Sequence, residues 1–167
     1  MSADQQEFPL APMTTDLRVM TYIVYAVPVA LVVAGVRFPP MFGVAGLVVL
    51  IYVSVWLWFR PTRFVLTSDS LVLEWPMRRL EVPLSDITEA RVITRADFRR
   101  EFRYGLRVGA GGLWGGFGLL VTGKGALTMY ISRTDRFVLL GRATGRSMLL
   151  SPDPPDGFVA ALEKGRR

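Results

Sequence analysis

The stretch that decides the fold reads VMTYIVYAVPVALVVAGV (Val19–Val36), RFPP (Arg37–Pro40) and MFGVAGLVVLIYVSVWLWF (Met41–Phe59). Its two apolar segments are 18 and 19 residues long and contain no charged side chain. As α-helices they would extend about 27–29 Å, close to the ~30 Å hydrocarbon thickness of a bilayer. A buried helix pair in a soluble core is the alternative, but two such segments in close succession favour a transmembrane hairpin with helices over about residues 19–36 and 41–59.

The hairpin separates a short polar N-terminus from a strongly basic remainder. Residues 1–16 combine acidic side chains with two prolines, which is typical of a mobile tail and unlike the basic start of a secretory signal. Of the 20 basic side chains in the chain, only Arg18 and Arg37 precede Arg60. We therefore expect a tail (1–16), the transmembrane hairpin (17–60) and a basic domain (61–164) that prefers anionic partners.

Arginines around the hairpin predict its orientation. The connection between the helices carries only Arg37, whereas the outer flanks carry five arginines. These five are Arg18, Arg60, Arg63, Arg78 and Arg79. Because cytoplasmic flanks are enriched in arginine and lysine, we expect a multi-pass protein of the inner (plasma) membrane with both termini in the cytoplasm.

Side chains at the ends of the two apolar segments are typical of a membrane interface. Aromatic rings and arginine anchor helices at the level of the head groups. The residues of this kind are Tyr22, Trp56, Trp58 and Arg60.

Small residues recur every four positions in the first helix, at Ala26, Ala30 and Ala34. Such a stripe lets another helix approach closely, although alanine is also simply common in transmembrane helices. Pro28 lies in the middle of the same helix and should kink it, because its nitrogen has no hydrogen to bond one turn back. The stripe predicts helix packing, either within the hairpin or against a membrane-protein partner.

After Arg60 the hydrophobic pattern changes to a period of two, as in Leu71, Leu73 and Trp75. Short apolar runs separated by glycine or charged turns predict about eight strands. They cover residues 64–66, 71–75, 80–84, 87–93, 117–121, 127–131, 137–140 and 147–150. Asp153 is expected to cap a C-terminal helix that begins with Pro154 and Pro155. This order predicts an antiparallel barrel or sandwich followed by one helix.

Residues 60–164 resemble a family of bacterial PH (pleckstrin-homology-like) domain membrane proteins. The motifs that carry the resemblance are Phe64–Thr67, Ser70–Leu73, Val82–Ile87, the glycine-rich region before Phe117 and Gly118, and Ser151–Pro155 followed by Phe158 and Leu162. The resemblance implies a mainly antiparallel PH-like barrel with one C-terminal capping helix, carried by the transmembrane hairpin. Phosphoinositide-binding PH domains have basic residues in the loop between the first two strands. That loop here is Thr67–Ser70, which contains an acid and no base, so we expect no specific inositol-phosphate site there.

The composition excludes several kinds of chemistry. With no cysteine and no histidine, the chain has no thiol nucleophile, no imidazole base and no zinc site of the usual ligands. Gly118–Gly125 (GLLVTGKG) is one residue short of a P-loop, and Gly125 replaces the serine or threonine that ligates magnesium. We predict no catalytic residue, no metal and no cofactor, and assign the glycine-rich run from Gly105 to Gly118 to a loop and bulges.

One basic stretch is the candidate binding region. Its arginines are Arg91, Arg95, Arg99, Arg100, Arg103 and Arg107, interleaved with Phe98, Phe102 and Tyr104. They could bind anionic lipid head groups or a partner, or stack on nucleic acid, or form a solvated face neutralised by Asp97 and Glu101. We expect membrane lipids or a membrane-protein partner as ligands, and no nucleic acid.

The sequence thus predicts a non-enzymatic integral membrane protein. Its cytoplasmic PH-like domain would serve as a scaffold or as a protein- or lipid-interaction module. The alternative is an accessory or immunity subunit of a larger membrane transport complex, which would act through its transmembrane helices.

Overall fold

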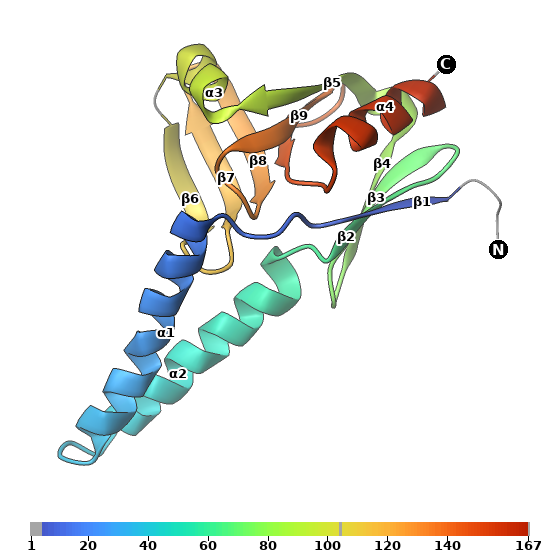
Figure 1. Cartoon of the computed structure of the whole chain (residues 1–167). Coiled ribbons are helices and arrows are strands. Elements are labelled where there is room, and N and C mark those ends of the chain that lie inside the picture. Colours follow the sequence, from blue (N-terminus) through green and yellow to red (C-terminus); the bar gives the residue numbers. More distant parts are fainter. Residues whose placement is uncertain (1–4, 104, 167) are drawn as a thin grey trace.

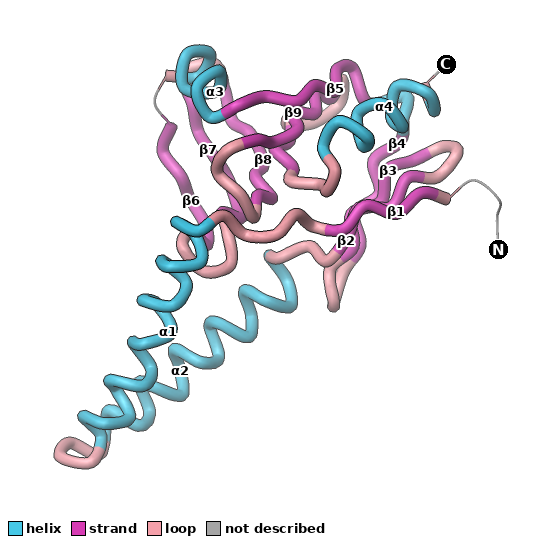
Figure 2. The backbone as a smooth tube through the Cα atoms, in the orientation of Figure 1, coloured by secondary structure: helices cyan, strands magenta, loops and turns pink. Residues whose placement is uncertain are grey.

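The computed structural model describes residues 5–103 and 105–166 (Figures 1 and 2). Its first large elements are α1 (Thr15–Gly35) and α2 (Pro40–Ser54), and a π-helical turn over Val55–Phe59 extends α2. Both helices are long and apolar enough to cross a membrane. They project together from a sheet domain, and the short connection between them lies at the far tip (Figure 1). The two apolar helices are therefore as predicted.

The seam between α1 and α2 is formed by residues spaced alternately three and four apart. The buried or half-buried positions with this spacing are Val24, Pro28, Leu31 and Gly35 on α1, and Met41, Ala45, Val48 and Tyr52 on α2. This spacing is that of helices packed nearly parallel to each other's axes, as in coiled coils. Ala26, Ala30 and Ala34 are exposed and lie outside the seam. The alanine stripe therefore does not join the two helices, and its packing against another protein stays a prediction.

The first sheet has four antiparallel strands in the order β1-β2-β3-β4. They are β1 (Gln6–Pro9), β2 (Arg63–Leu66), β3 (Ser70–Glu74) and β4 (Arg79–Pro83). The expectation of a mobile tail is wrong for β1, which pairs with β2 along its full length. The physical reason is Phe8, whose buried ring meets Phe158 edge-on with 5.2 Å between centroids.

The second sheet has six strands in the order β5-β9-β10-β8-β7-β6. They are β5 (Ile87–Thr94), β6 (Gly105–Gly111), β7 (Gly116–Thr122), β8 (Gly125–Ile131), β9 (Arg136–Arg142) and β10 (Met148–Leu150). All neighbours are antiparallel except β10 and β8, which are parallel. β6 occupies residues that were expected to form a loop.

The described strands form two sheets, which is the sandwich of the two predicted alternatives, and no closed barrel is found among them. A short 3₁₀ turn over Leu84–Asp86 separates the sheets, since it ends the pairing of β4 before β5 joins β9. One core lies between the sheets, where β3 contributes Leu71 and Leu73 and β9 contributes Val138 and Leu140.

The C-terminal helix α4 (Pro155–Gly165) closes this core with Phe158 and Leu162, which are fully buried. The predicted cap is wrong in detail, because the helix begins at Pro155 and Pro154 occupies the N-cap position. Asp153 instead donates its backbone N–H to the carbonyl of Pro9 at 3.0 Å. This bond ties the start of α4 to the end of β1.

Candidate functional site

The structure places a helix, α3 (Arg95–Phe102), inside the basic stretch, where the sequence analysis predicts none. Thr94 begins it: its hydroxyl accepts the backbone N–H of Asp97 at 3.2 Å and donates to the Asp97 carboxylate at 2.6 Å. This reciprocal cap satisfies an N-terminal amide of the helix. Arg103 ends the helix with a φ of 54°, which redirects the chain toward β6. Tyr104 lies outside the described residues.

An arginine-rimmed pocket forms where α3 and β6 meet the outer face of the second sheet. Its rim holds Arg95 and Arg99 from α3, Arg103 from the end of the helix and Arg107 from β6, around a volume of about 320 Å³. Its apolar lining is Phe98, Leu120, Met129, Ile131, Phe137 and Leu149. The structure thus brings together four of the six arginines in the basic stretch.

The other two arginines of the stretch point elsewhere. Arg91 donates to both carboxylate oxygens of Glu101, at 2.7 and 2.6 Å, and also pairs with Glu89. The hydrogen bonds to Glu101 raise the pKa of Arg91 above its ordinary value. Arg100 is largely exposed and lies 3.8 Å from a carboxylate oxygen of Asp97. Neither guanidinium belongs to the pocket.

The positive charge of the pocket is not neutralised by ion pairs among the described residues. Within residues 5–103 and 105–166, none of its four arginines forms an ion pair. The nearby carboxylate of Asp135 is held by Arg133, which lowers the pKa of Asp135 to about 2. Arginine stems can cover an apolar floor while their guanidinium groups stay available for carboxylates or phosphates. The pocket is therefore suited to an anionic ligand that also carries an apolar group.

A free strand edge borders the pocket. β6 is the last strand of its sheet, and its only strand neighbour among the described residues is β7. Leu106 and Val108 on this strand are 71% and 55% exposed. Unpaired backbone groups at an edge can pair with an added strand from another chain.

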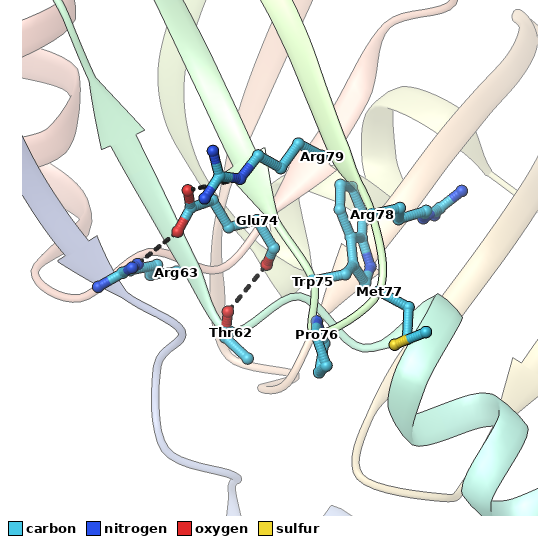
Figure 3. A pocket seen from close by; sticks show the side chains of 8 residues that line it. All are labelled: Thr62, Arg63, Glu74, Trp75, Pro76, Met77, Arg78 and Arg79. Carbon is cyan, nitrogen blue, oxygen red and sulfur yellow. Dashed lines mark hydrogen bonds and ion pairs between the residues drawn. The ribbon is translucent and has the colours of Figure 1, made fainter.

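A second, shallower hollow of about 660 Å³ lies at the turn between β3 and β4 (Figure 3). Glu74 bridges two arginines there, with Arg63 Nε at 2.6 Å and Arg79 Nε at 3.1 Å. The guanidinium of Arg78 stacks over the Trp75 ring at 4.1 Å from its centroid. Because Glu74 neutralises its arginines in part, this hollow is less cationic than the arginine-rimmed pocket.

The loop between β6 and β7 attaches the sheet domain to the helices. The hydroxyl of Thr21 in α1 accepts the backbone N–H of Trp114 at 3.1 Å, and the indole N–H of Trp114 donates to the Tyr25 hydroxyl at 2.6 Å. The Trp114 ring also packs edge-on against Trp56 of α2 at 5.0 Å. The backbone of Trp114 has a φ of 58°, a conformation that only a well-determined contact sustains in a bulky residue.

The residues expected at a membrane interface lie near this attachment. Arg60 stacks over the Trp56 ring, with its guanidinium 4.4 Å from the centroid. Tyr22 and Trp58 are exposed on the helix surfaces. Trp56 thus has a contact with the sheet domain that its position in the sequence does not indicate, whereas the roles of Tyr22 and Trp58 at a membrane interface stay predictions.

Comparison with known proteins identifies the sheet domain. No curated protein and no solved structure matches the chain. The family model of the bacterial PH domain matches residues 62–165, from the start of β2 to the end of α4. The chain therefore belongs to the bacterial PH-domain family.

Proposed function

We propose that this protein is a non-enzymatic interaction module anchored in the inner membrane. Its two apolar helices would cross the bilayer, with both termini and the PH-like domain on the cytoplasmic side. The arginine-rimmed pocket would receive an acidic, extended segment of another protein. The length and hydropathy of the helices and the arginines on their outer flanks support the membrane part of this proposal.

One observation carries the ligand class. Four arginines that form no ion pair among the described residues surround an apolar floor beside the free edge of β6. An extended segment can pair with such an edge through its backbone, while alternate side chains enter the pocket. Acidic side chains among apolar ones would match both the rim and the floor.

The position of the pocket favours a protein segment over the head groups of the surrounding bilayer. α3 lies at the end of the sheet domain away from the helices (Figure 1). Thr134 at the pocket donates to Asp16 in the first turn of α1 at 2.8 Å. From Asp16 to Tyr22, where the exposed aromatic residues begin, the helix rises about 9 Å. α3, which carries Arg95 and Arg99 of the rim, lies farther still from the apolar part of the helices (Figure 1).

Binding of a labelled peptide of alternating glutamate and valine to the full chain in detergent micelles tests the proposal. We expect the double variant Arg99→Glu/Arg103→Glu to weaken binding at least about tenfold, because two rim cations become anions. The control Arg100→Glu/Arg146→Glu changes the net charge equally but leaves the pocket intact, and should retain most of the affinity. A peptide with glutamine for glutamate should bind poorly to the wild type.

Equal weakening by both double variants would contradict the proposal, since it would indicate non-specific attraction to a basic protein. N-methylation of alternate peptide bonds tests the strand-pairing mode, because it removes the backbone donors. Binding of vesicles containing phosphatidylglycerol that is lost with Arg99→Glu/Arg103→Glu, without peptide binding, would indicate a lipid ligand instead.

The alternative function, as an accessory subunit of a larger membrane complex, has its own supporting observation. Ala26, Ala30 and Ala34 form an exposed stripe of small residues that α2 does not cover. Such a stripe allows close approach of another transmembrane helix. Replacement of all three by leucine should release a co-purifying membrane protein in mild detergent, whereas the control Val32→Leu, on the opposite face of α1, should not.

A further inference from the structure

We infer that the turn between β3 and β4, residues Trp75–Arg78, contacts the anionic head-group layer of the bilayer next to the end of α2. This inference rests on the proposed membrane crossing of the helices, but it is independent of the ligand proposed for the arginine-rimmed pocket.

The turn lies at the end of the β2–β3 hairpin that is nearest the helices. Only Arg60, Pro61 and Thr62 connect the end of the α2 helix to β2. β3 runs back antiparallel to β2 and ends with Glu74 opposite Arg63. The Glu74 carbonyl accepts both the backbone N–H of Thr62, at 2.7 Å, and its hydroxyl, at 3.0 Å. The turn therefore begins level with Thr62 and continues toward the helices, as Figure 1 shows.

The reach of the turn follows from standard geometry. Two further residues of extended chain advance about 7 Å beyond Glu74. Thr62 follows Phe59, the last helical residue, by three residues of non-helical chain, which span at most about 10 Å. Pro76 and Met77 at the tip thus lie near the level of the helix end, where the exposed ring of Trp58 is of the kind found at membrane interfaces.

The tip of the turn combines exposed apolar and cationic side chains. Met77 is 60% exposed although its side chain is apolar, and Pro76 beside it is exposed as well. Behind the tip, Arg78 and Arg79 are exposed (Figure 3). An apolar tip followed by cations matches the interface, where methionine can enter the acyl boundary while arginine binds phosphate.

The two ends of the β2–β3 hairpin differ in charge and polarity. The turn at the other end, between β2 and β3, contains exposed Ser68 and Asp69 and no base. It is separated from Thr62 by the length of β2, Arg63–Leu66. The end near the helices is therefore basic and apolar, and the end away from them is acidic and polar.

Fluorescence quenching in nanodiscs tests the inference. Because the chain has no cysteine, Met77→Cys, Ser68→Cys and Val33→Cys each give a single labelling site for an environment-sensitive fluorophore. The nanodiscs contain phosphatidylcholine and phosphatidylglycerol, with a quencher attached either near the head group or deep in the acyl chain. We expect the shallow quencher to act on Met77→Cys, at least one of the two quenchers to act on Val33→Cys, which lies inside the proposed span, and neither to act on Ser68→Cys.

The outcomes separate this inference from the proposed function. A quenched Val33→Cys with Met77→Cys as unquenched as Ser68→Cys overturns the inference and leaves the membrane crossing intact. An unquenched Val33→Cys overturns both. Addition of Arg78→Glu/Arg79→Glu to Met77→Cys should reduce shallow quenching in nanodiscs with phosphatidylglycerol. Unchanged quenching in that variant would overturn the assigned role of anionic lipid.

Discussion

The hydroxyl of Tyr52 in α2 donates a hydrogen bond of 2.8 Å to the backbone carbonyl of Val24 in α1. In a regular helix that carbonyl would accept the N–H of residue 28, but residue 28 is proline and has none. In the proposed membrane span no water would replace the missing donor, so a side chain of a neighbouring helix would have to satisfy the carbonyl. The pair explains how a proline is accommodated inside an apolar helix and fixes the register of the seam.

The first prediction is a coupling between Tyr52 and Pro28. Tyr52→Phe should lower the free energy of unfolding of the helix pair by about 1 kcal/mol, because it leaves the Val24 carbonyl unsatisfied. In a Pro28→Ala background, the new N–H can bond to that carbonyl, so Tyr52→Phe should cost less. Denaturation of the four proteins in detergent, followed by circular dichroism, measures the cycle. The same cost in both backgrounds would contradict the explanation.

The second prediction concerns Trp114, which joins the β6–β7 loop to both helices. Trp114→Ala should lower the stability of this attachment by about 3 kcal/mol, because a buried aromatic ring is removed. Hydrogen exchange should accelerate in the loop around Gly112–Gly115 and stay slow in the seam of α1 and α2. Trp114→Phe is the matched variant, since it keeps a ring against Trp56 and loses only the bond to Tyr25. Exchange that is unchanged in Trp114→Ala would exclude this loop as the attachment.

The third prediction concerns the strand that the N-terminal segment forms. Phe8→Ala should lower the free energy of unfolding by about 3 kcal/mol, because the ring is buried against Phe158 in the main core. Gln6→Ala changes an exposed residue of the same strand and serves as the control. Thermal unfolding of the two variants compares them directly. If both variants have the melting temperature of the wild type, β1 does not contribute to the stability of the fold.

The sequence predicts elements whose signal is local. The lengths and hydropathy of the two helices, the alternation in β3 and the apolar positions of α4 all lie within short windows. α3 also has a local signal, because Thr94 and Asp97 have the spacing of a helix N-cap and its partner.

The remaining features depend on contacts between distant residues. β1 pairs with a strand more than fifty residues away, and its four residues show no clear alternation. β10 inserts between β9 and β8, so strand order along the chain does not give sheet order. The arginine stretch is evident in the sequence, but its division into pocket residues and others depends on α3 and on floor residues from β7, β8, β9 and β10.

The fourth prediction is a pH dependence that originates at Asp86. Its carboxylate accepts the backbone N–H and hydroxyl of Thr144 and the Nε of Arg142, at 2.6–2.7 Å. These bonds, those from Thr144 first, lower the pKa of Asp86 from 3.8 to about 2. A folded-state pKa below the unfolded value stabilises the fold above about pH 4, and this stabilisation disappears as the pH falls toward 2.

Asp86→Asn should therefore lower the urea midpoint at pH 6 and approach the wild-type midpoint near pH 2. Asp69→Asn, at an exposed turn, is the charge-matched control. A difference between Asp86→Asn and the wild type that stays constant from pH 6 to pH 2 would show that the ionised carboxylate is not what stabilises this contact between the start of β5 and the end of β9.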